Sequence, residues 1–203
     1  MNNLKFDTIF EGAMKCLKNA QDLCDEAEIL HKHDKFARSF ALSHFAREEF
    51  GKCFMLFRAL VDVASGQKVD WKKLNRRFRD HKQKLVNDCV ISASMFGSEL
   101  KAHGLPLEDV FSGINFKNDR KNNCLYTDWS DGSFTLPSDM ITEDQSERNL
   151  SLAIYRIAKL TPQLVRLQDL KNVSQQELKE KYPKDIPENL DDLLNALSNS
   201  EQT

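Results

Sequence analysis

Glycine and proline are scarce in this sequence of 203 residues, with seven and five copies. A β-sandwich or β-barrel needs many tight turns, which are built mainly from these two residues. Leucine, alanine, lysine and glutamate are plentiful instead, and all four favour helices. The composition therefore predicts a mainly helical protein, long enough to bury one hydrophobic core without disulfides.

The patterns of disulfide-rich, zinc-binding and membrane proteins are also missing. The five cysteines are widely spaced and form no Cys-x-x-Cys pair, so we expect reduced thiols, several of them in the core. No run of 18 apolar residues occurs, and the N-terminus lacks the apolar segment of a signal peptide. These features predict a cytoplasmic protein with no membrane span.

Sites for common cofactors are not indicated either. The sequence has no glycine-rich phosphate loop and no Gly-x-Ser-x-Gly motif. Glu48 and Glu49 could suggest the di-metal centre of a helical bundle, but neither is followed by a histidine three positions later. We therefore expect no metal ion and no other cofactor.

Apolar residues recur at intervals of three and four over long stretches, which predicts helices. The first should run from residue 6 to about 31, and the second from about 34 to 66. The apolar residues of the second spread around the helical wheel, so this helix should be central. A third helix, antiparallel to the second, is expected to follow residues 67–70 and to continue to about 103.

The helical pattern breaks between about residues 105 and 141. Asp131-Gly132 lies between two short aromatic runs, which is a signal for a β-hairpin. We expect the hairpin to pack against the helices, because an isolated two-stranded ribbon is marginally stable in water. Tyr126 and Trp129 should contribute to the packing of the hairpin rather than form a platform for stacking bases.

Capping boxes at Thr142 and Ser174 predict a fourth long helix and a shorter one after it. Pro162 should kink or divide the fourth helix. Short C-terminal helices are expected over about residues 174–198, with a disordered end at 198–203. We see no linker, so the sequence predicts one all-α domain over residues 1–203 with a small hairpin insertion between the third and fourth long helices.

A basic segment stands out in a chain whose formal net charge is only −2. Residues 68–84 hold eight lysines and arginines against Asp70 and Asp80, a local net charge of +6. Such a patch is typical of a site for a phosphate-bearing partner, although a solvated charged face gives the same pattern. His81 shares an apolar stripe with Leu74, Phe78 and Leu85, so we expect its imidazole to face the protein interior.

Arg76 and His81 in this segment have the chemistry that metal-independent RNA cleavage needs. Histidine can exchange protons with the 2′-hydroxyl or the leaving 5′-oxygen, and arginine can hold the charged phosphorane. On one helix the two would lie about 140° apart, so long side chains would have to converge in a cleft. Arg-x4-His also occurs by chance.

Polar residues in the apolar second helix are candidates for a supporting role. Glu48 and Lys52 are spaced as an i, i+4 pair, and His44 precedes Glu48 by one turn on the same face. If these groups are buried they need partners, and the cations of the third helix are the obvious ones.

Three segments, spread over about residues 10–170, match the sequence pattern of a known protein family and occur in the same order as in that family. They are Ala41-Leu-Ser-His-Phe-Ala-Arg-Glu-Glu-Phe-Gly-Lys52, Phe78-Arg-Asp-His-Lys-Gln-Lys-Leu85, and Lys121-Asn-Asn-Cys-Leu-Tyr-Thr-Asp128 with Asp131-Gly-Ser-Phe-Thr-Leu-Pro137. Together they resemble the AbiV-type abortive infection proteins of the HEPN superfamily.

This resemblance implies an HEPN-like helical bundle, a homodimer, and a role in bacterial defence against phage. HEPN ribonucleases pair an arginine and a histidine in an Arg-x4–6-His motif, two copies of which meet at the dimer interface. Arg76 and His81 match that spacing and would be catalytic. Two features depart from the usual pattern: Arg77 stands where a small polar residue is common, and the motif lies earlier in the chain.

Two hypotheses follow. In the first, the protein is an abortive infection effector that blocks translation by binding or cleaving RNA, with Arg77, Arg79, Lys82 and Lys84 holding RNA and with His44, Glu48, Glu49 and Lys52 in support. In the second, it is a non-enzymatic module that binds a phage protein as its activator or target. The aromatic second helix and the acidic, leucine-bearing C-terminal segment motivate the second hypothesis.

Overall fold

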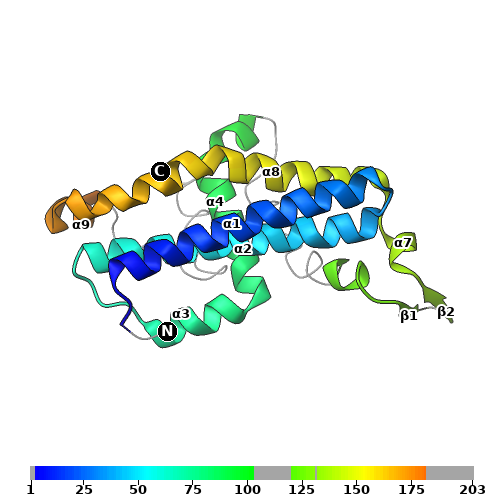
Figure 1. Ribbon diagram of the computed structural model, residues 1–203, viewed down its shortest axis with the longest axis horizontal. Coiled ribbons are helices and arrows are strands. Elements are labelled where there is room, and N and C mark those ends of the chain that lie inside the picture. Colours follow the sequence, from blue (N-terminus) through cyan, green and yellow to red (C-terminus); the bar gives the residue numbers. More distant parts are fainter. Residues whose placement is uncertain (1–2, 103–119, 131, 182–203) are drawn as a thin grey trace.

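The computed structural model describes residues 3–102, 120–130 and 132–181. Three long helices lie side by side and form the body of the molecule: α1 (Phe6–Lys32), α2 (Phe36–Ala64) and α8 (Glu143–Val165) (Figure 1). One core cluster joins the middle of all three, and a second joins the first half of α1 to the second half of α2. The predicted first, second and fourth helices are therefore confirmed.

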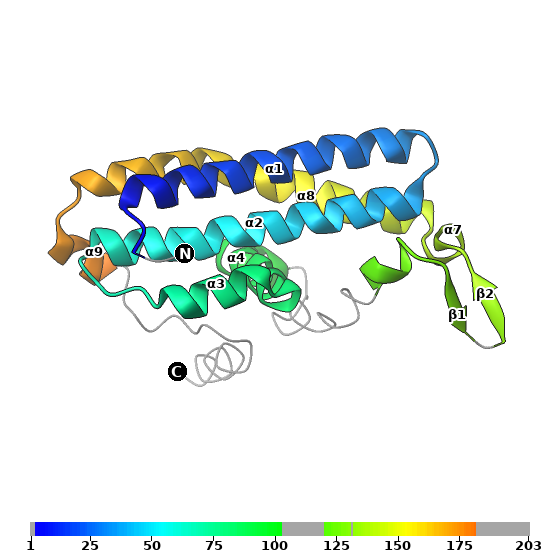
Figure 2. The same ribbon diagram turned by 60° about the horizontal axis from the view of Figure 1, so that its bottom comes forward.

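Helix α2 is the centre of the bundle, as its apolar pattern predicted. Helices α1 and α8 pack on one side of it, and α3 and α4 approach it from another (Figure 2). Large apolar side chains such as Phe50, Met55 and Leu60 are fully buried along its length. Several polar residues of α2, among them His44, Arg47 and Glu48, are buried as well, and the charged ones need partners from neighbouring elements.

The prediction of one continuous third helix is wrong. The structure has two helices, α3 (Trp71–Arg79) and α4 (His81–Ala102), separated by Asp80 in an extended conformation with ψ 116°. The carboxylate of Asp80 accepts a hydrogen bond from the backbone N–H of Gln83 at 3.2 Å. Such a side-chain cap competes with helix continuation and favours a new N-terminus. Helix α3 runs along α2, whereas α4 crosses the bundle (Figure 1).

Gly51 makes the crossing of α4 over α2 possible. A Cβ atom built at this position would lie 2.2 Å from the carbonyl oxygen of Lys84. Only glycine allows two helix backbones to come this close. The crossing brings the first turns of α4 directly against the middle of α2.

The predicted β-hairpin is present and projects from the end of the bundle (Figure 2). Strands β1 (Asp128–Ser130) and β2 (Ser133–Thr135) are antiparallel, and Trp129 lies opposite Phe134. The expectation that the hairpin packs against the helices is wrong for its aromatic residues, because Trp129 is 58% exposed and Phe134 74%. Their rings contact each other instead, with centroids 4.7 Å apart.

The remaining described elements are short. Helix α7 (Pro137–Met140) leads into α8, whose N-terminus has the predicted capping box at Thr142. Pro162 does not divide α8, which continues to a 3₁₀ helix, η1 (Arg166–Asn172), and then to α9 (Gln175–Lys181). The expected C-terminal helix and disordered end, beyond residue 181, lie outside the described residues.

The predicted fold class is confirmed as an all-α bundle with a small hairpin insertion. The five cysteines are free thiols, four of them buried. Among the described helices, none has the length and apolar character to cross a membrane.

Candidate functional site

A buried carboxylate in the middle of α2 organises the site. The side chain of Glu48 is only 2% exposed, and basic groups from three parts of the chain surround it. Lys84 Nζ lies 2.9 Å from Oε2, and Lys121 Nζ lies 3.0 Å from Oε1. His81 Nδ1 is 2.6 Å from Oε2, and His44 Nε2 is 3.7 Å from Oε1. A glutamate in so apolar a helix can be ionised only with partners of this kind.

Local structure explains why these groups meet. His81 is the first residue of α4 and Lys84 follows one turn later, so both side chains reach α2 where the helices cross at Gly51. Lys121 lies in a helical segment that the structure describes from residue 120 onward. Burial opposes the ionised form of Glu48, but hydrogen bonds from Lys84 and Lys121 outweigh it and hold the pKa of this carboxyl below its usual value.

His81 differs from the other members because its side chain is 51% exposed. The prediction that it lies on a buried apolar stripe is therefore wrong, since the helix break at Asp80 turns the ring toward the surface. Nδ1 donates to the buried Glu48 carboxylate, which leaves Nε2 as the ring nitrogen for proton exchange. A half-exposed imidazole oriented by a buried carboxylate is an arrangement that suits general acid–base chemistry.

His44 is fully buried one turn before Glu48, and within the described part of the chain neither ring nitrogen has a hydrogen-bond partner. The pKa of His44 is lowered to about 3, mainly by burial and secondly by the positive charge of Arg47. The ring is therefore neutral at physiological pH and acts as a packing element behind Glu48 rather than as a cation.

The other predicted site residues fall into two groups. Arg76, Arg79 and Lys82 are exposed on α3 and on the first turn of α4. Because successive helical residues are about 100° apart, Arg76 and Arg79 share the outward side of α3 with Lys72. The break at Asp80 places Arg76 and His81 on different helices, so the angle expected for a single helix does not apply.

Two further predicted RNA contacts are less exposed. Lys84 is buried on Glu48, and Arg77 is half-buried, with Nη2 donating to Asn87 Oδ1 at 3.4 Å. The expected pairing of Lys52 with Glu48 is also wrong, because Lys52 forms an ion pair with Glu49. The structure thus brings together His44, Glu48, His81 and Lys84, and leaves Glu49 and Lys52 beside them.

A second buried ionic network lies next to the first and was missed in the sequence. Asp88 of α4 is fully buried and accepts hydrogen bonds from Arg47 Nη2 at 2.8 Å and Arg156 Nη1 at 2.5 Å. Arg47 also donates to Asn149 of α8 at 3.0 Å. Burial opposes ionisation of Asp88, but the two arginines hold the pKa of this carboxyl below its usual value. This network anchors α4 to both α2 and α8.

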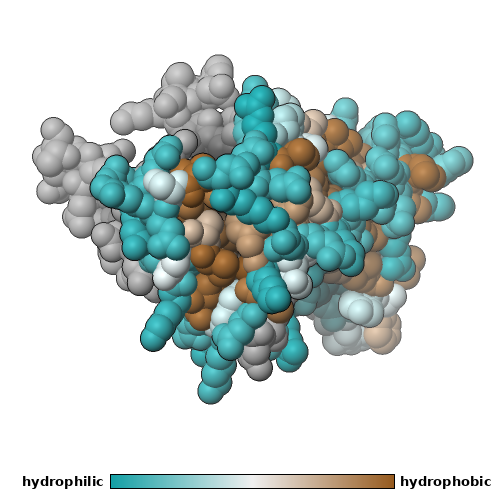
Figure 3. All heavy atoms as spheres, turned by 60° about the vertical axis from the view of Figure 1, so that its left-hand side comes forward, coloured by the Kyte–Doolittle hydropathy of each residue, from teal (hydrophilic) through white to brown (hydrophobic). Residues whose placement is uncertain are grey.

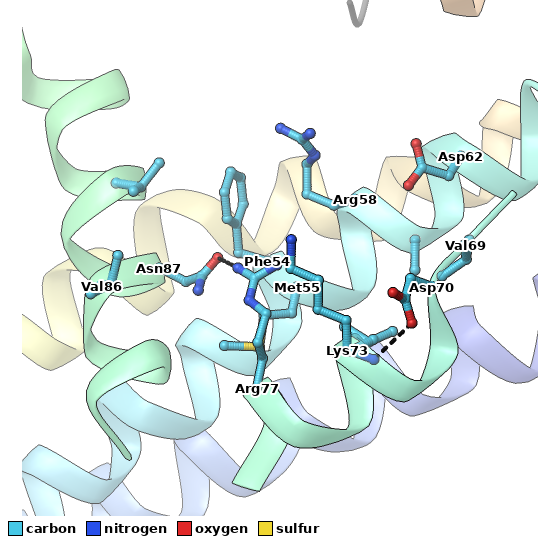
Figure 4. A pocket seen from close by; sticks show the side chains of 13 residues that line it. Phe54, Met55, Arg58, Asp62, Val69, Asp70, Lys73, Arg77, Val86 and Asn87 are labelled. Carbon is cyan, nitrogen blue, oxygen red and sulfur yellow. Dashed lines mark hydrogen bonds between the residues drawn. The ribbon is translucent and has the colours of Figure 1, made fainter. Parts of the chain in front are cut away.

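A pocket of about 80 Å³ lies beside the site, between α2, α3 and α4 (Figure 4). Its apolar lining includes Phe54, Met55, Leu74 and Val86. Arg58, Lys73 and Arg77 line it together with Asp62 and Asp70. The pocket therefore combines an apolar floor with a charged rim.

The fold is that of an all-helical, HEPN-like bundle, in which the basic helix α3 runs along the central helix α2 and α4 crosses it. The family model for AbiV, an HEPN family, matches residues 8–158, which is well over half of the chain. The chain belongs to the AbiV family. This membership indicates an HEPN-type function in abortive infection defence. Comparisons with curated proteins and with solved structures give no significant match.

Proposed function

We propose that this protein is an anti-phage effector that blocks translation in the cytoplasm by cleaving RNA without a metal ion. One observation carries the proposal: the half-exposed His81 is held at 2.6 Å by a buried, ionised carboxylate beside exposed arginines. General acid–base catalysis needs a titratable group in a fixed orientation, and cleavage of a phosphodiester needs permanent cations close by.

In this mechanism, Nε2 of His81 takes the proton of a 2′-hydroxyl or gives a proton to the leaving 5′-oxygen. Arg76 holds the charged phosphorane, and Arg79 and Lys82 hold the flanking phosphates. Glu48 is a positioning residue, since it acts by fixing the ring of His81.

The proposal includes a homodimer in which two copies of the site face each other, as the Arg-x4–6-His motifs of HEPN ribonucleases do. Helix α4 begins at the surface with His81, so this end of the helix can meet a second copy. Lys84 and Lys121 neutralise Glu48 from within, while the exposed cations of both copies would face the RNA between them.

The test uses purified protein and total RNA in the presence of a chelator. Wild type should degrade the RNA, whereas His81→Ala should lose at least about 100-fold in rate, the usual contribution of a general acid or base. Arg76→Ala should also lose about 100-fold or more, as expected for a group that stabilises charge in the transition state. His33→Ala and Arg148→Ala are matched controls, because both residues are exposed away from the site. Equal activity of wild type and His81→Ala would remove this site from the reaction.

A non-enzymatic module that binds a phage protein is the second candidate. It is favoured by the exposure of Leu152, Ile154 and Tyr155 on α8, because exposed apolar groups mark protein contacts. Figure 3 shows the side of the molecule that lies on the left in Figure 1, and apolar surface gathers there too among hydrophilic side chains. Capture of a phage protein from infected cells, with His81→Ala still protective, would support this candidate against catalysis.

A further inference from the structure

The projecting hairpin and the segments that flank it are acidic and apolar at once. Residues 126–147 contain no lysine or arginine, and their acids are Asp128, Asp131, Asp139, Glu143, Asp144 and Glu147. Tyr126, Trp129, Phe134 and Leu136 are all more than half exposed. The negative charge repels phosphates, so this surface does not suit RNA despite its aromatic residues. It suits a basic surface with an apolar floor.

The same chain carries such a surface in the pocket between α2, α3 and α4. Arg58, Lys73 and Arg77 line it over an apolar floor that includes Phe54 and Met55. Asp62 and Asp70 also line it, but the two carboxylates are outnumbered by the three cations (Figure 4). An aromatic side chain flanked by carboxylates would bury its ring on the floor and place its charges at the rim.

The two surfaces are placed symmetrically about Glu48 along α2. The base of the hairpin rests on Ala37 and Ala41, through Cys124 and Ile141. The pocket includes Met55 and Ala59. At 1.5 Å per residue, the midpoints of these two pairs lie about 14 Å to either side of Glu48.

The two pairs of residues also lie on the same side of α2 as Glu48. At about 100° per residue, Ala37, Ala41, Met55 and Ala59 each lie within about 20° of Glu48 around the helix. In agreement, α3 and the hairpin leave the layer of long helices on the same side (Figure 2). A two-fold axis through the site, perpendicular to α2, would place the hairpin of one copy over the pocket of the other, and the reverse.

We propose that the hairpin of each copy docks into this pocket of a second copy, so that two chains clasp each other on both sides of the paired His81 sites. The inference rests on the homodimer of the proposed function and adds the surfaces that form it. Trp129 or Phe134 packs on the apolar floor, and Asp128 and Asp139 approach Arg58 and Lys73. Arg76, Arg79 and Lys82, which the pocket does not include, stay available to RNA.

Sedimentation velocity of the full chain over a range of concentrations provides the test. The double variant Trp129→Ser/Phe134→Ser should weaken dimerisation by at least about tenfold, which corresponds to about 1.4 kcal/mol. Ile29→Ser, at an exposed apolar residue on α1, is the matched control and should dimerise like wild type. Unchanged dimerisation of the hairpin variant, or a wild type that stays monomeric, would overturn the clasp.

Charge reversal on each side gives an independent test that does not depend on the hairpin aromatics. Asp128→Lys/Asp139→Lys and Arg58→Glu/Lys73→Glu should each dimerise weakly alone. A mixture of the two should form a heterodimer, because both clasps in that pair are again between opposite charges. Failure of the mixture to associate, with helical content intact by circular dichroism, would contradict the proposal.

RNA cleavage measured on the same samples separates this inference from the proposed function. A wild type that cleaves RNA through His81 and dimerises independently of the hairpin would retain the function and lose the clasp. A clasped dimer with no His81-dependent activity would retain the clasp and refute the proposed function.

Discussion

Replacing Glu48 with glutamine tests whether the buried carboxylate holds the site together. The change keeps the size of the side chain but removes the charge that Lys84 and Lys121 neutralise at 2.9 and 3.0 Å. Both ammonium groups are buried and would lose their anion. Breaking a buried ion pair in this way costs about 3–5 kcal/mol, so we expect Glu48→Gln to lose roughly that free energy of unfolding at pH 7.

The pH dependence of this loss follows from the lowered pKa of Glu48, which Lys84 and Lys121 maintain against the effect of burial. A carboxyl whose pKa is lower in the folded state stabilises the protein above its ordinary pKa of 4.5. That contribution is lost as the pH falls through the folded-state pKa. The difference between wild type and Glu48→Gln should therefore be complete at pH 7 and shrink as the pH falls below 4.5.

Urea unfolding followed by circular dichroism at a series of pH values measures both effects. Glu49→Gln is the matched control, because Glu49 is the neighbouring residue and pairs only with Lys52 among the ion pairs described. Its partly exposed pair should contribute about 1 kcal/mol or less. A Glu48→Gln variant as stable as wild type at pH 7, or a difference that persists unchanged at pH 3, would refute the reasoning.

Two further substitutions probe the packing behind the site. Gly51→Ala places a methyl group 2.2 Å from the Lys84 carbonyl oxygen and should cost about 3 kcal/mol or more by forcing α4 away from α2. Gly12→Ala, whose methyl group would lie in ordinary contact with Leu56 at 3.5 Å, should instead stabilise the protein by about 0.5–1 kcal/mol. Thermal unfolding compares the two variants, and equal effects would contradict the close crossing. The pKa of His44 is lowered to about 3 in the folded state. As the pH falls below about 6.5, this histidine is therefore protonated in the unfolded state but not in the folded state, which destabilises the protein. Relative to wild type, His44→Leu should thus gain about 2 kcal/mol between pH 7 and pH 5 in urea unfolding, and no gain would mean that His44 is not held neutral.

Much of the fold could be predicted because long helices leave a periodic signal. The helices beginning at Phe6, Phe36 and Glu143 follow from apolar spacing and capping residues that are visible in the sequence. The break at Asp80 was missed because a single side-chain cap decided it, against an apolar period that continues through it. The exposure of the hairpin aromatics depends on where the hairpin lies, which local sequence does not encode.

The candidate site could likewise be predicted only in part. Glu48 and His81 could be singled out because a polar group in an apolar helix and a histidine in a basic segment are unusual. The burial of Lys84 and the arrival of Lys121 depend on how α4 crosses α2. Asp88 gave one signal, a lone acid in an apolar stretch, but its arginine partners come from two distant helices.

The most direct test of the central claim is the chemistry of the cut RNA ends. If His81 exchanges protons with a 2′-hydroxyl, wild-type protein in a chelating buffer should leave 2′,3′-cyclic phosphate ends, and a substrate with a 2′-deoxy group at the cut position should resist. His81→Ala should leave the RNA intact. RNA that stays intact with wild type, or identical products from wild type and His81→Ala, would contradict the account.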